Sequence, residues 1–556
     1  MQAKLEDLFF FGGDFTAFCG DCGEVKFSAF KAEVGNLAGY FESLEEGEFA
    51  LHILRDAHLF SKLFFALLQA GKAVYLAPSE EIAESIKRRE GVPVISNAGG
   101  AVGNFTLPQN LPEADFKFKN MRGGRVYFFT SGSTSAPKTI LKLFGSLSDE
   151  TLNSAKILPH EKNTRILATC EPCHLYGMLW RILCPLALGL EIDNKTIKTP
   201  EELIARQSSC ESAVIETTPS FIEALAKYRD MFSFPKNCVG ITTSGGLLKK
   251  EFSESALAMW GRTPMEIFGS TESGGIAVRD QSKSQEWEVF ERVEVGLDDR
   301  GCINAKSPYA CGGFFQLNDM VELLEGGRKF LLRGRIDRLA KVGETQVFLP
   351  DLESVYCRHS HVENIRIEML GETLRALVVP SLEGKLALLK CGKLSFAKEL
   401  NRFASSEFER KLLPKKFRIV NRFPLNPQGK LLFSTVKNLL LNKIDEPLVF
   451  ERKLSENGFS CRLSFLKTNS YFKGHFPSIA ILPGVVQLYF AEFFIRENFE
   501  VGGCVRTVKK LKFSNVIRPL DMLELKIEKA GGGAFSFEYS KGGAVCSSAL
   551  IEFSNV

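Results

Sequence analysis

The chain has 556 residues, of which 45% are hydrophobic and 24% are charged. Because this length exceeds what one hydrophobic core usually supports, we expect several domains. The net charge of +4, from 70 basic and 66 acidic residues, is too small to indicate a nucleic-acid-binding protein. No apolar run reaches the length of a membrane span and the N-terminus has no secretory cleavage signal, so we expect a cytoplasmic protein.

The first hundred residues alternate between strand and helix patterns. Predicted strands at residues 50–54 and 73–76 flank a helix-period stretch at residues 59–69. A second helix at residues 82–89 leads to a strand at residues 93–96. This alternation predicts an α/β fold built on a parallel sheet.

A turn of small and hydroxyl residues follows a predicted strand at residues 126–129. Its backbone N–H groups can approach an anion closely, while hydroxyls and one lysine add donors and positive charge. It lacks the spacing of the Walker loop, and an ordinary surface connection is the alternative. The residues that would bind phosphates are Thr130, Ser131, Gly132, Ser133, Thr134 and Lys138.

Two further turns of this kind follow the predicted strands at residues 239–243 and 265–268. The first turn contains Gly245 and Gly246, and the second contains Gly269, Ser270, Thr271 and Glu272. In an open parallel sheet the turns at the carboxyl ends of the strands line the ligand crevice. We therefore expect the three turns to face one crevice.

The 14 cysteines include two C-x-x-C pairs, Cys19 with Cys22 and Cys170 with Cys173. A zinc site needs two such pairs brought together. Pro172 interrupts the second pair, and the pairs are far apart in the sequence. Scattered reduced thiols are the interpretation that we favour.

Five segments in order resemble motifs of the adenylate-forming superfamily, which contains acyl-CoA synthetases, peptide-synthetase adenylation domains and luciferases. One motif alone would be weak evidence, and the order of all five carries the resemblance. The segments are FFTSGSTSAPK (128–138), FGSTE (268–272), FQLND (315–319), GRIDRLAKVG (334–343) and PLNPQGK (424–430).

The resemblance implies that ATP and Mg²⁺ activate a carboxylic acid as acyl-AMP, and that a CoA or phosphopantetheine thiol then accepts the acyl group. It implies a large domain at residues 1–337 and a small mobile domain at residues 338–442, with Asp337 as the hinge. The resemblance implies that residues 130–138 bind the β- and γ-phosphates, and that Thr271, beside Gly269 and Ser270, contacts the α-phosphate. It implies that Glu272 binds Mg²⁺ and that Asp319 and Arg335 bind the ribose. Lys430 would act in the transfer of the acyl group to AMP, and His174, Gly245 and Gly246 would line the acid pocket.

Each of these residues has a structural alternative when it is considered alone. Glu272 could cap a helix, Asp319 could lie in a turn, Lys430 could be a solvated lysine and His174 could be a partly buried structural residue. A non-catalytic acyl or nucleotide sensor is an alternative for the whole chain. The presence together of Glu272, Asp319, Arg335 and Lys430 argues against it.

The last part of the chain, residues 447–556, resembles the hotdog-fold 3-hydroxyacyl-acyl-carrier-protein dehydratases. The matching segments are YFKGHFP (471–477), ILPGVVQ (481–487) and KLKFSNVIRPLDMLEL (510–525). The resemblance implies an α+β domain with a sheet around one long helix, with His475 as the base. It also implies a homodimer, since these domains complete their sites as dimers.

The acid partner of His475 is open, because the position of the family's carboxylate holds Tyr489. Glu492 lies one helical turn further on. Tyr489 or Glu492 could serve as the acid, the domain could be a thioesterase, or it could only bind acyl chains and form dimers. We favour dehydration of a 3-hydroxyacyl thioester.

A ligase fused to a dehydratase-like domain resembles the enzymes of aryl-polyene and related fatty-acid-like synthesis. This resemblance predicts an aromatic or unsaturated acid as substrate, and CoA or an acyl carrier protein as partner. The sequence decides neither the acid nor the acceptor.

Overall fold

The computed structural model describes residues 5–11, 13–97, 103–108, 111, 116–130, 138–227, 229–426, 431–442, 444–455, 457–475, 479–499 and 501–554. The chain forms two compact units. One contains Met1–Ile336 with Leu425–Leu432, and the other contains Asp337–Pro424 with Phe433–Val556. The boundary falls beside Asp337, the expected hinge.

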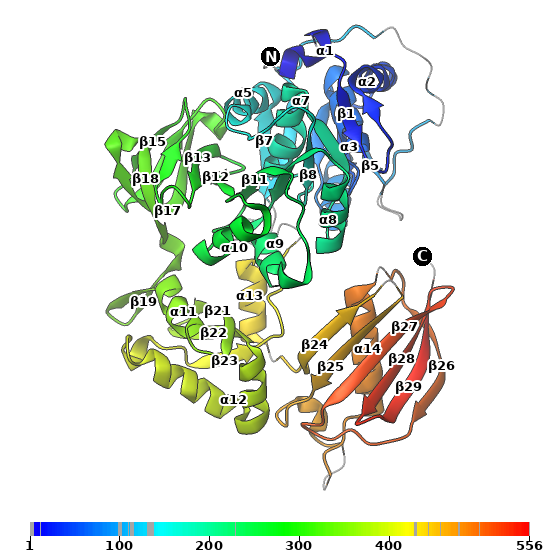
Figure 1. Cartoon of the computed structure of the whole chain (residues 1–556), viewed down its shortest axis with the longest axis vertical. Coiled ribbons are helices and arrows are strands. Elements are labelled where there is room, and N and C mark those ends of the chain that lie inside the picture. Colours follow the sequence, from blue (N-terminus) through cyan, green and yellow to red (C-terminus); the bar gives the residue numbers. More distant parts are fainter. Residues whose placement is uncertain are drawn as a thin grey trace. The chain divides into compact units, whose positions relative to one another are not determined.

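A thirteen-stranded mixed sheet runs through the first unit (Figure 1). The strands β8, β10, β11 and β12 are mutually parallel neighbours, as the sequence predicts, whereas β13 returns antiparallel to β12 after a tight turn. The strands, in sheet order, are β15 (Glu294–Leu297), β16 (Cys302–Lys306), β17 (Phe314–Leu324), β18 (Lys329–Arg335), β14 (Trp287–Val289), β13 (Gly274–Asp280), β12 (Met265–Ser270), β11 (Cys238–Ser244), β10 (Ser212–Thr217), β8 (Thr164–Ala168), β9 (Glu191–Thr196), β1 (Thr16–Cys19) and β2 (Val25–Lys26).

A second sheet of five strands lies in the same unit. Its strands, in order, are β5 (Val94–Ser96), β3 (Glu48–His52), β4 (Ala73–Leu76), β6 (Arg125–Thr130) and β7 (Lys138–Leu143). Its first four strands are parallel and β7 pairs antiparallel with β6. The turn after β6 therefore belongs to this second sheet, whereas the turns after β11 and β12 follow strands of the first sheet.

Helices cover these sheets and bury apolar faces. α3 is apolar almost all round and eleven of its residues are buried, which suits a helix enclosed within a core. Asp56 caps it by accepting the N–H of Leu59. The helices of this unit are α1 (Leu8–Phe11), α2 (Phe27–Glu42), α3 (Ala57–Gln69), α4 (Glu80–Glu90), α5 (Phe144–Ala155), α6 (Leu175–Gly177), α7 (Cys184–Leu188), α8 (Pro200–Ser208), α9 (Pro219–Ala226) and α10 (Lys250–Trp260).

The second unit begins with a small α+β domain. Arg338, 7% exposed, fixes its start by donating to the carboxylates of Glu353 and Glu368 at 2.5 and 2.7 Å. Its elements are β19 (Leu339–Val342), β20 (Thr345–Phe348), α11 (Leu349–Cys357), β21 (Val362–Leu370), β22 (Thr373–Pro380), α12 (Leu382–Ala404), β23 (Lys416–Ile419) and α13 (Phe433–Leu441).

The rest of the second unit is a six-stranded antiparallel sheet with helix α14 (Gly484–Asn498) against one face (Figure 1). Phe490, Phe494 and Ile495 of α14 form a core with Leu525 and Ile527 of the sheet. This arrangement is the expected hotdog fold. The sheet order is β24 (Leu448–Leu454), β25 (Gly458–Ser464), β27 (Leu523–Gly531), β28 (Ala534–Lys541), β29 (Ala544–Phe553) and β26 (Val505–Phe513), of which the first strand was not predicted.

The small domain and the hotdog domain share buried side chains. Leu448 and Leu466 of the hotdog domain belong to the hydrophobic core of the small domain. The side chain of Asn421 accepts the N–H of Val449 and donates to the carbonyl of Pro447, at 2.8 and 2.9 Å. These contacts bind the end of the connecting segment to both domains.

Candidate functional site

The turn between β12 and β13 presents Thr271 and Glu272. Ser270 and Gly274 pair across its base. The Ser270 N–H donates to Ser273 Oγ at 2.9 Å, and the Ser273 N–H donates to Ser270 Oγ at 3.1 Å. These reciprocal bonds fix the turn, and Thr271 and Glu272 lie half-buried at its tip.

Glycines at the base of this turn are required by close packing. A Cβ on Gly269 would lie 2.2 Å from the carbonyl oxygen of Gly274, and Gly274 has a φ of +70°. The two glycines therefore let β12 and β13 approach each other closely at the base of the turn that presents Thr271 and Glu272.

The end of β11 lies next to the end of β12. Ser244 is in register with Ile267, and its hydroxyl donates to the Ile267 carbonyl at 2.8 Å. Gly245, at φ +88°, and Gly246 follow and are exposed. The structure thus brings these two predicted turns together at one edge of the sheet.

The predicted phosphate loop is framed by the hairpin of β6 and β7. Thr130 and Lys138 pair directly across its base. Ser131, Gly132, Ser133 and Thr134 lie outside the described residues, as does Lys430.

Asp319 and Arg335 form a pair on neighbouring strands. They are in register on β17 and β18, and Arg335 Nη1 lies 3.5 Å from Asp319 Oδ2. Asp319 is only 9% exposed. An acceptor and a donor are thus held side by side, which suits recognition of vicinal hydroxyls.

His174 precedes the short helix α6 and is half-buried, and its carbonyl accepts the N–H of Met178 at 2.7 Å. Nearby, the Tyr176 hydroxyl donates to Thr242 Oγ1 at 2.9 Å. Thr242 is in register with Glu216, a fully buried residue of β10. The expected acid-pocket segment thus packs over the ends of β10 and β11.

Glu216 is a buried carboxyl that the sequence analysis did not single out. Burial raises its pKa to about 7, and its Oε2 accepts the N–H of Cys170 at 3.3 Å. In the sequence, the feature that could have indicated Glu216 is its position directly after the apolar residues 213–215 of a predicted strand. It lies beside the expected acid pocket and is a candidate for contact with substrate.

The cysteines of the two C-x-x-C pairs form no disulfide, and among the described residues they belong to no group of three or more possible metal ligands. All 14 cysteines are free, and burial raises the pKa of the Cys170 and Cys173 thiols. Neutral buried thiols are poor nucleophiles and poor metal ligands.

In the hotdog domain, His475 follows a short 3₁₀ turn and is half-buried. Tyr489 is 54% exposed on α14, with its ring against Phe490. The Glu492 carboxylate accepts from Arg496 Nε at 2.8 Å. Of the two candidate acids, Glu492 therefore already has a cationic partner.

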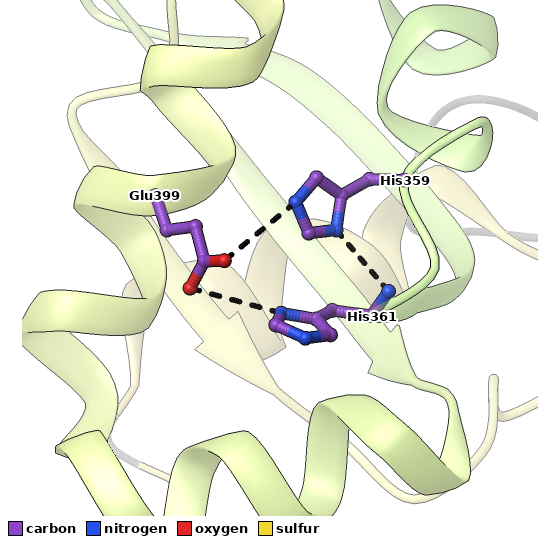
Figure 2. A group of neighbouring side chains, drawn as sticks. All are labelled: His359, His361 and Glu399. Atoms are coloured by element: carbon purple, nitrogen blue, oxygen red, sulfur yellow. Dashed lines mark hydrogen bonds and ion pairs between the residues drawn. The ribbon is translucent and has the colours of Figure 1, made fainter.

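Two histidines and a glutamate meet in the small domain (Figure 2). His359 Nε2 and His361 Nδ1 lie 3.9 and 3.8 Å from the oxygens of Glu399. The His361 N–H donates to His359 Nδ1 at 3.2 Å, so a neutral His359 ring carries its proton on Nε2. Because metal binding through Nε2 would need that proton on Nδ1, the cluster fits a hydrogen-bonded group better than a metal site.

The residues around the β12 turn fit a magnesium nucleotide. Glu272 offers the hard carboxylate oxygens that Mg²⁺ prefers. Thr271 offers a hydroxyl at the tip of the same turn, and the Asp319–Arg335 pair offers groups for a ribose. Bound Mg²⁺ would neutralise charge on the phosphates as they separate.

The first part of the chain has the fold of adenylate-forming ligases, and the last part has a hotdog fold. Residues 125–297 match the family described as AMP-binding enzyme, and residues 451–549 match the family described as ApeI dehydratase. The chain therefore contains an AMP-binding ligase region fused to an ApeI-like dehydratase domain.

Curated relatives and solved structures agree with this assignment. The chain is 27% identical over 309 residues to a 4-coumarate–CoA ligase of Cereibacter sphaeroides, covering 55% of this chain and 70% of the relative. It is 21% identical to a 2-succinylbenzoate–CoA ligase of a Geobacillus species, and the match covers 71% of this chain and 83% of the relative. The o-succinylbenzoate CoA synthetase of Bacillus subtilis has the same fold, with a TM-score of 0.65 at 17% identity, covering 79% of this chain and 98% of that one.

Within the part of the chain that the structure describes, no helix has both the length and the apolar character needed to cross a membrane.

The cluster in Figure 2 predicts an acid-sensitive contribution to stability. Burial, followed by the charge of His361, lowers the pKa of His359 from its ordinary value of 6.5, while Glu399 opposes the shift. Below pH 6.5 the unfolded chain therefore binds this proton more readily, and the stabilisation present above pH 6.5 is lost as the pH falls through the folded pKa. We expect the midpoint of thermal unfolding to fall between pH 7 and 5, and to fall less in His359→Gln. An equal fall of the unfolding midpoint in wild type and His359→Gln would show that His359 does not cause the acid sensitivity.

Proposed function

We propose that the ligase domain uses ATP and Mg²⁺ to convert an aromatic or unsaturated carboxylic acid into acyl-AMP and then transfers the acyl group to a pantetheine thiol. The observation that carries the proposal is the meeting of the ends of β11 and β12 at one sheet edge, with Thr271 and Glu272 on an ordered turn. The named substrates of the aryl-CoA ligase relatives support an aromatic acid.

Charge moves onto pyrophosphate in the first step, so the site needs fixed positive groups and donors. Residues 130–138 would hold the β- and γ-phosphates, and Thr271 would contact the α-phosphate. Glu272 would hold Mg²⁺, and Asp319 with Arg335 would hold the ribose. His174, Gly245 and Gly246 would line the acid pocket, at the edge where β10 and β11 end.

Lys430 would stabilise the charge that develops between the acyl carboxylate and the α-phosphate. A rotation at Asp337 would bring it in for adenylation and withdraw it for transfer to the thiol of CoA or of a carrier protein. The division of the chain between Ile336 and Asp337 supports a hinge there.

Replacing Lys430 by alanine tests this assignment. ATP–pyrophosphate exchange should fall on the order of a hundredfold or more, since a donor to the transition state is lost. Thiol transfer from supplied acyl-adenylate should be largely retained. The matched control is Lys437→Ala on α13, which should leave the exchange unchanged. Unchanged exchange in Lys430→Ala would contradict the proposed role of Lys430 in adenylation.

For the hotdog domain we propose the dehydration of a 3-hydroxyacyl thioester. His475 would take the α-proton while an acid protonates the leaving hydroxyl, so that a C–H and a C–O bond break, a C=C bond forms and water leaves. The ion pair of Glu492 with Arg496 favours the Tyr489 hydroxyl as the acid.

Dehydration of a 3-hydroxyacyl carrier protein should fall on the order of a hundredfold or more in His475→Ala. Tyr489→Phe should show a comparable loss, and Glu492→Gln a small one. A large loss of dehydration in Glu492→Gln and a small one in Tyr489→Phe would identify Glu492 as the acid. Hydrolysis of the thioester without dehydration would show a thioesterase instead.

We propose that a second copy of the chain covers an apolar surface of the hotdog domain. Val485, Tyr489 and Phe513 are 73%, 54% and 51% exposed. A Cβ on Gly484 would lie 2.4 Å from the Phe513 ring, so the start of α14 adjoins β26. β26 is an edge strand whose outer side is free to pair in the described sheet.

Sedimentation of the full chain tests this surface. The wild-type protein should be dimeric, and the double variant Val485→Glu with Phe513→Glu should weaken association at least about tenfold. Lys526→Glu, on the exposed face of β27, should leave association unchanged. A monomeric wild-type protein would contradict the proposal.

A further inference from the structure

A buried carboxyl lies directly behind the turn that carries Thr271 and Glu272. Glu150 of α5 is 2% exposed, and its Oε1 accepts the N–H of Gly275 at 2.6 Å. A Cβ on Gly274 would lie 2.9 and 3.0 Å from the two carboxyl oxygens. Glu150 therefore sets how far the base of the turn can move toward α5.

A buried lysine connects the hairpin of β6 and β7 to the same region. Lys142 of β7 is 3% exposed, and its Nζ donates to the carbonyl of Tyr309 at 2.6 Å. Two residues further on, the Cys311 N–H donates to the carbonyl of Glu272 at 2.9 Å. The segment from Tyr309 to Cys311 is thus bonded both to the hairpin and to the turn.

Tyr309 also fills the space between these elements. Its side chain is 1% exposed, and a Cβ on Gly274 would lie 2.7 Å from its ring. Its hydroxyl accepts from Asn153 Nδ2, on the same helix as Glu150, at 3.3 Å. A change in the position of α5, the hairpin or the turn would therefore have to displace the other two.

Lys142 and Glu150 are a buried base and a buried acid within this packed region. Burial raises the pKa of Glu150, and the positive charge of Lys142 opposes the rise. A buried ammonium or carboxylate is costly unless it is bonded, and Lys142 bonds to the Tyr309 carbonyl while Glu150 bonds to the Gly275 N–H. Apolar side chains could fill the same volume at lower cost in stability, which points to a role in defining geometry.

We propose that Glu150, together with Lys142, is a positioning residue for acyl-AMP formation that fixes the distance between the Thr271–Glu272 turn and the β6–β7 hairpin. One nucleotide must contact both elements, with its α-phosphate and Mg²⁺ at the turn and its outer phosphates at the hairpin. This inference rests on the function proposed above for the two elements. A displacement of about 1 Å at such a site can reduce the rate on the order of a hundredfold.

The test is Glu150→Gln in the full chain, which keeps the acceptor for Gly275 and removes the charge. We expect the KM for MgATP and the Mg²⁺ concentration for half-maximal exchange to rise on the order of tenfold, with the KM for the acid changed less than about twofold. The acid is the best one from a panel of benzoate, 4-coumarate and octanoate. Glu254→Gln, an exposed residue of α10, is the matched control.

The double variant Glu150→Gln with Lys142→Met should raise the KM for MgATP no more than Glu150→Gln alone does, because the acid and the base are removed together. A purely structural role would lower the unfolding temperature while leaving the Mg²⁺ dependence unchanged, and that result would overturn the proposal. If the effects of the two substitutions on the KM for MgATP add in the double variant, Glu150 and Lys142 do not act together.

Calorimetric titration with MgATP, which needs no acid, separates this inference from the proposed function. If wild-type protein binds MgATP but catalyses no exchange, the proposed reaction fails, and weaker binding in Glu150→Gln still supports the positioning role. Equal MgATP affinities in wild type and Glu150→Gln would overturn it. A wild-type protein that does not bind MgATP would overturn both.

Discussion

The parallel pairing of β11 with β12, followed by the immediate return of β13, brings together the turns proposed for the ligase site. Parallel neighbours end at the same edge, so the exposed glycines after Ser244 lie beside the turn that presents Thr271 and Glu272. The return is possible because Gly269 and Gly274 approach more closely than any side chain would allow. The Asp319–Arg335 pair depends on the same sheet, since β17 and β18 continue it beyond β14.

Buried charges support this region from behind. Glu150 lies against the backbone of the turn, and Lys142 bonds to a segment whose other end holds the Glu272 carbonyl. Glu216 lies at the end of β10, where burial raises its pKa to about 7. Such groups reduce stability relative to apolar packing, and the benefit that can offset this cost is a defined geometry at the site.

The second unit joins the small domain and the hotdog domain in one packed body. Leu448 and Leu466 of the hotdog domain complete the core of the small ligase domain, and Asn421 bonds to both ends of the junction at Pro447 and Val449. Arg422 of the small domain and Arg452 of the hotdog domain both pair with Glu497 of α14. The junction at residues 447–449 is thus held by packing and hydrogen bonds from both domains.

The sequence by itself determined the fold class, the ligase and dehydratase families, and the strands and helices that alternate before the Thr271 turn and in the hotdog domain, because these follow from local periodicity and from motifs that are contiguous in the chain. It also predicted the turns that carry Thr271 and Glu272. Only the tertiary structure decided that the phosphate-loop hairpin belongs to a second sheet, that Glu150 and Glu216 are buried beside the site, and that the hotdog domain shares a core with the small domain. These features depend on which distant segments pack together, and neither residue spacing nor composition carries that information.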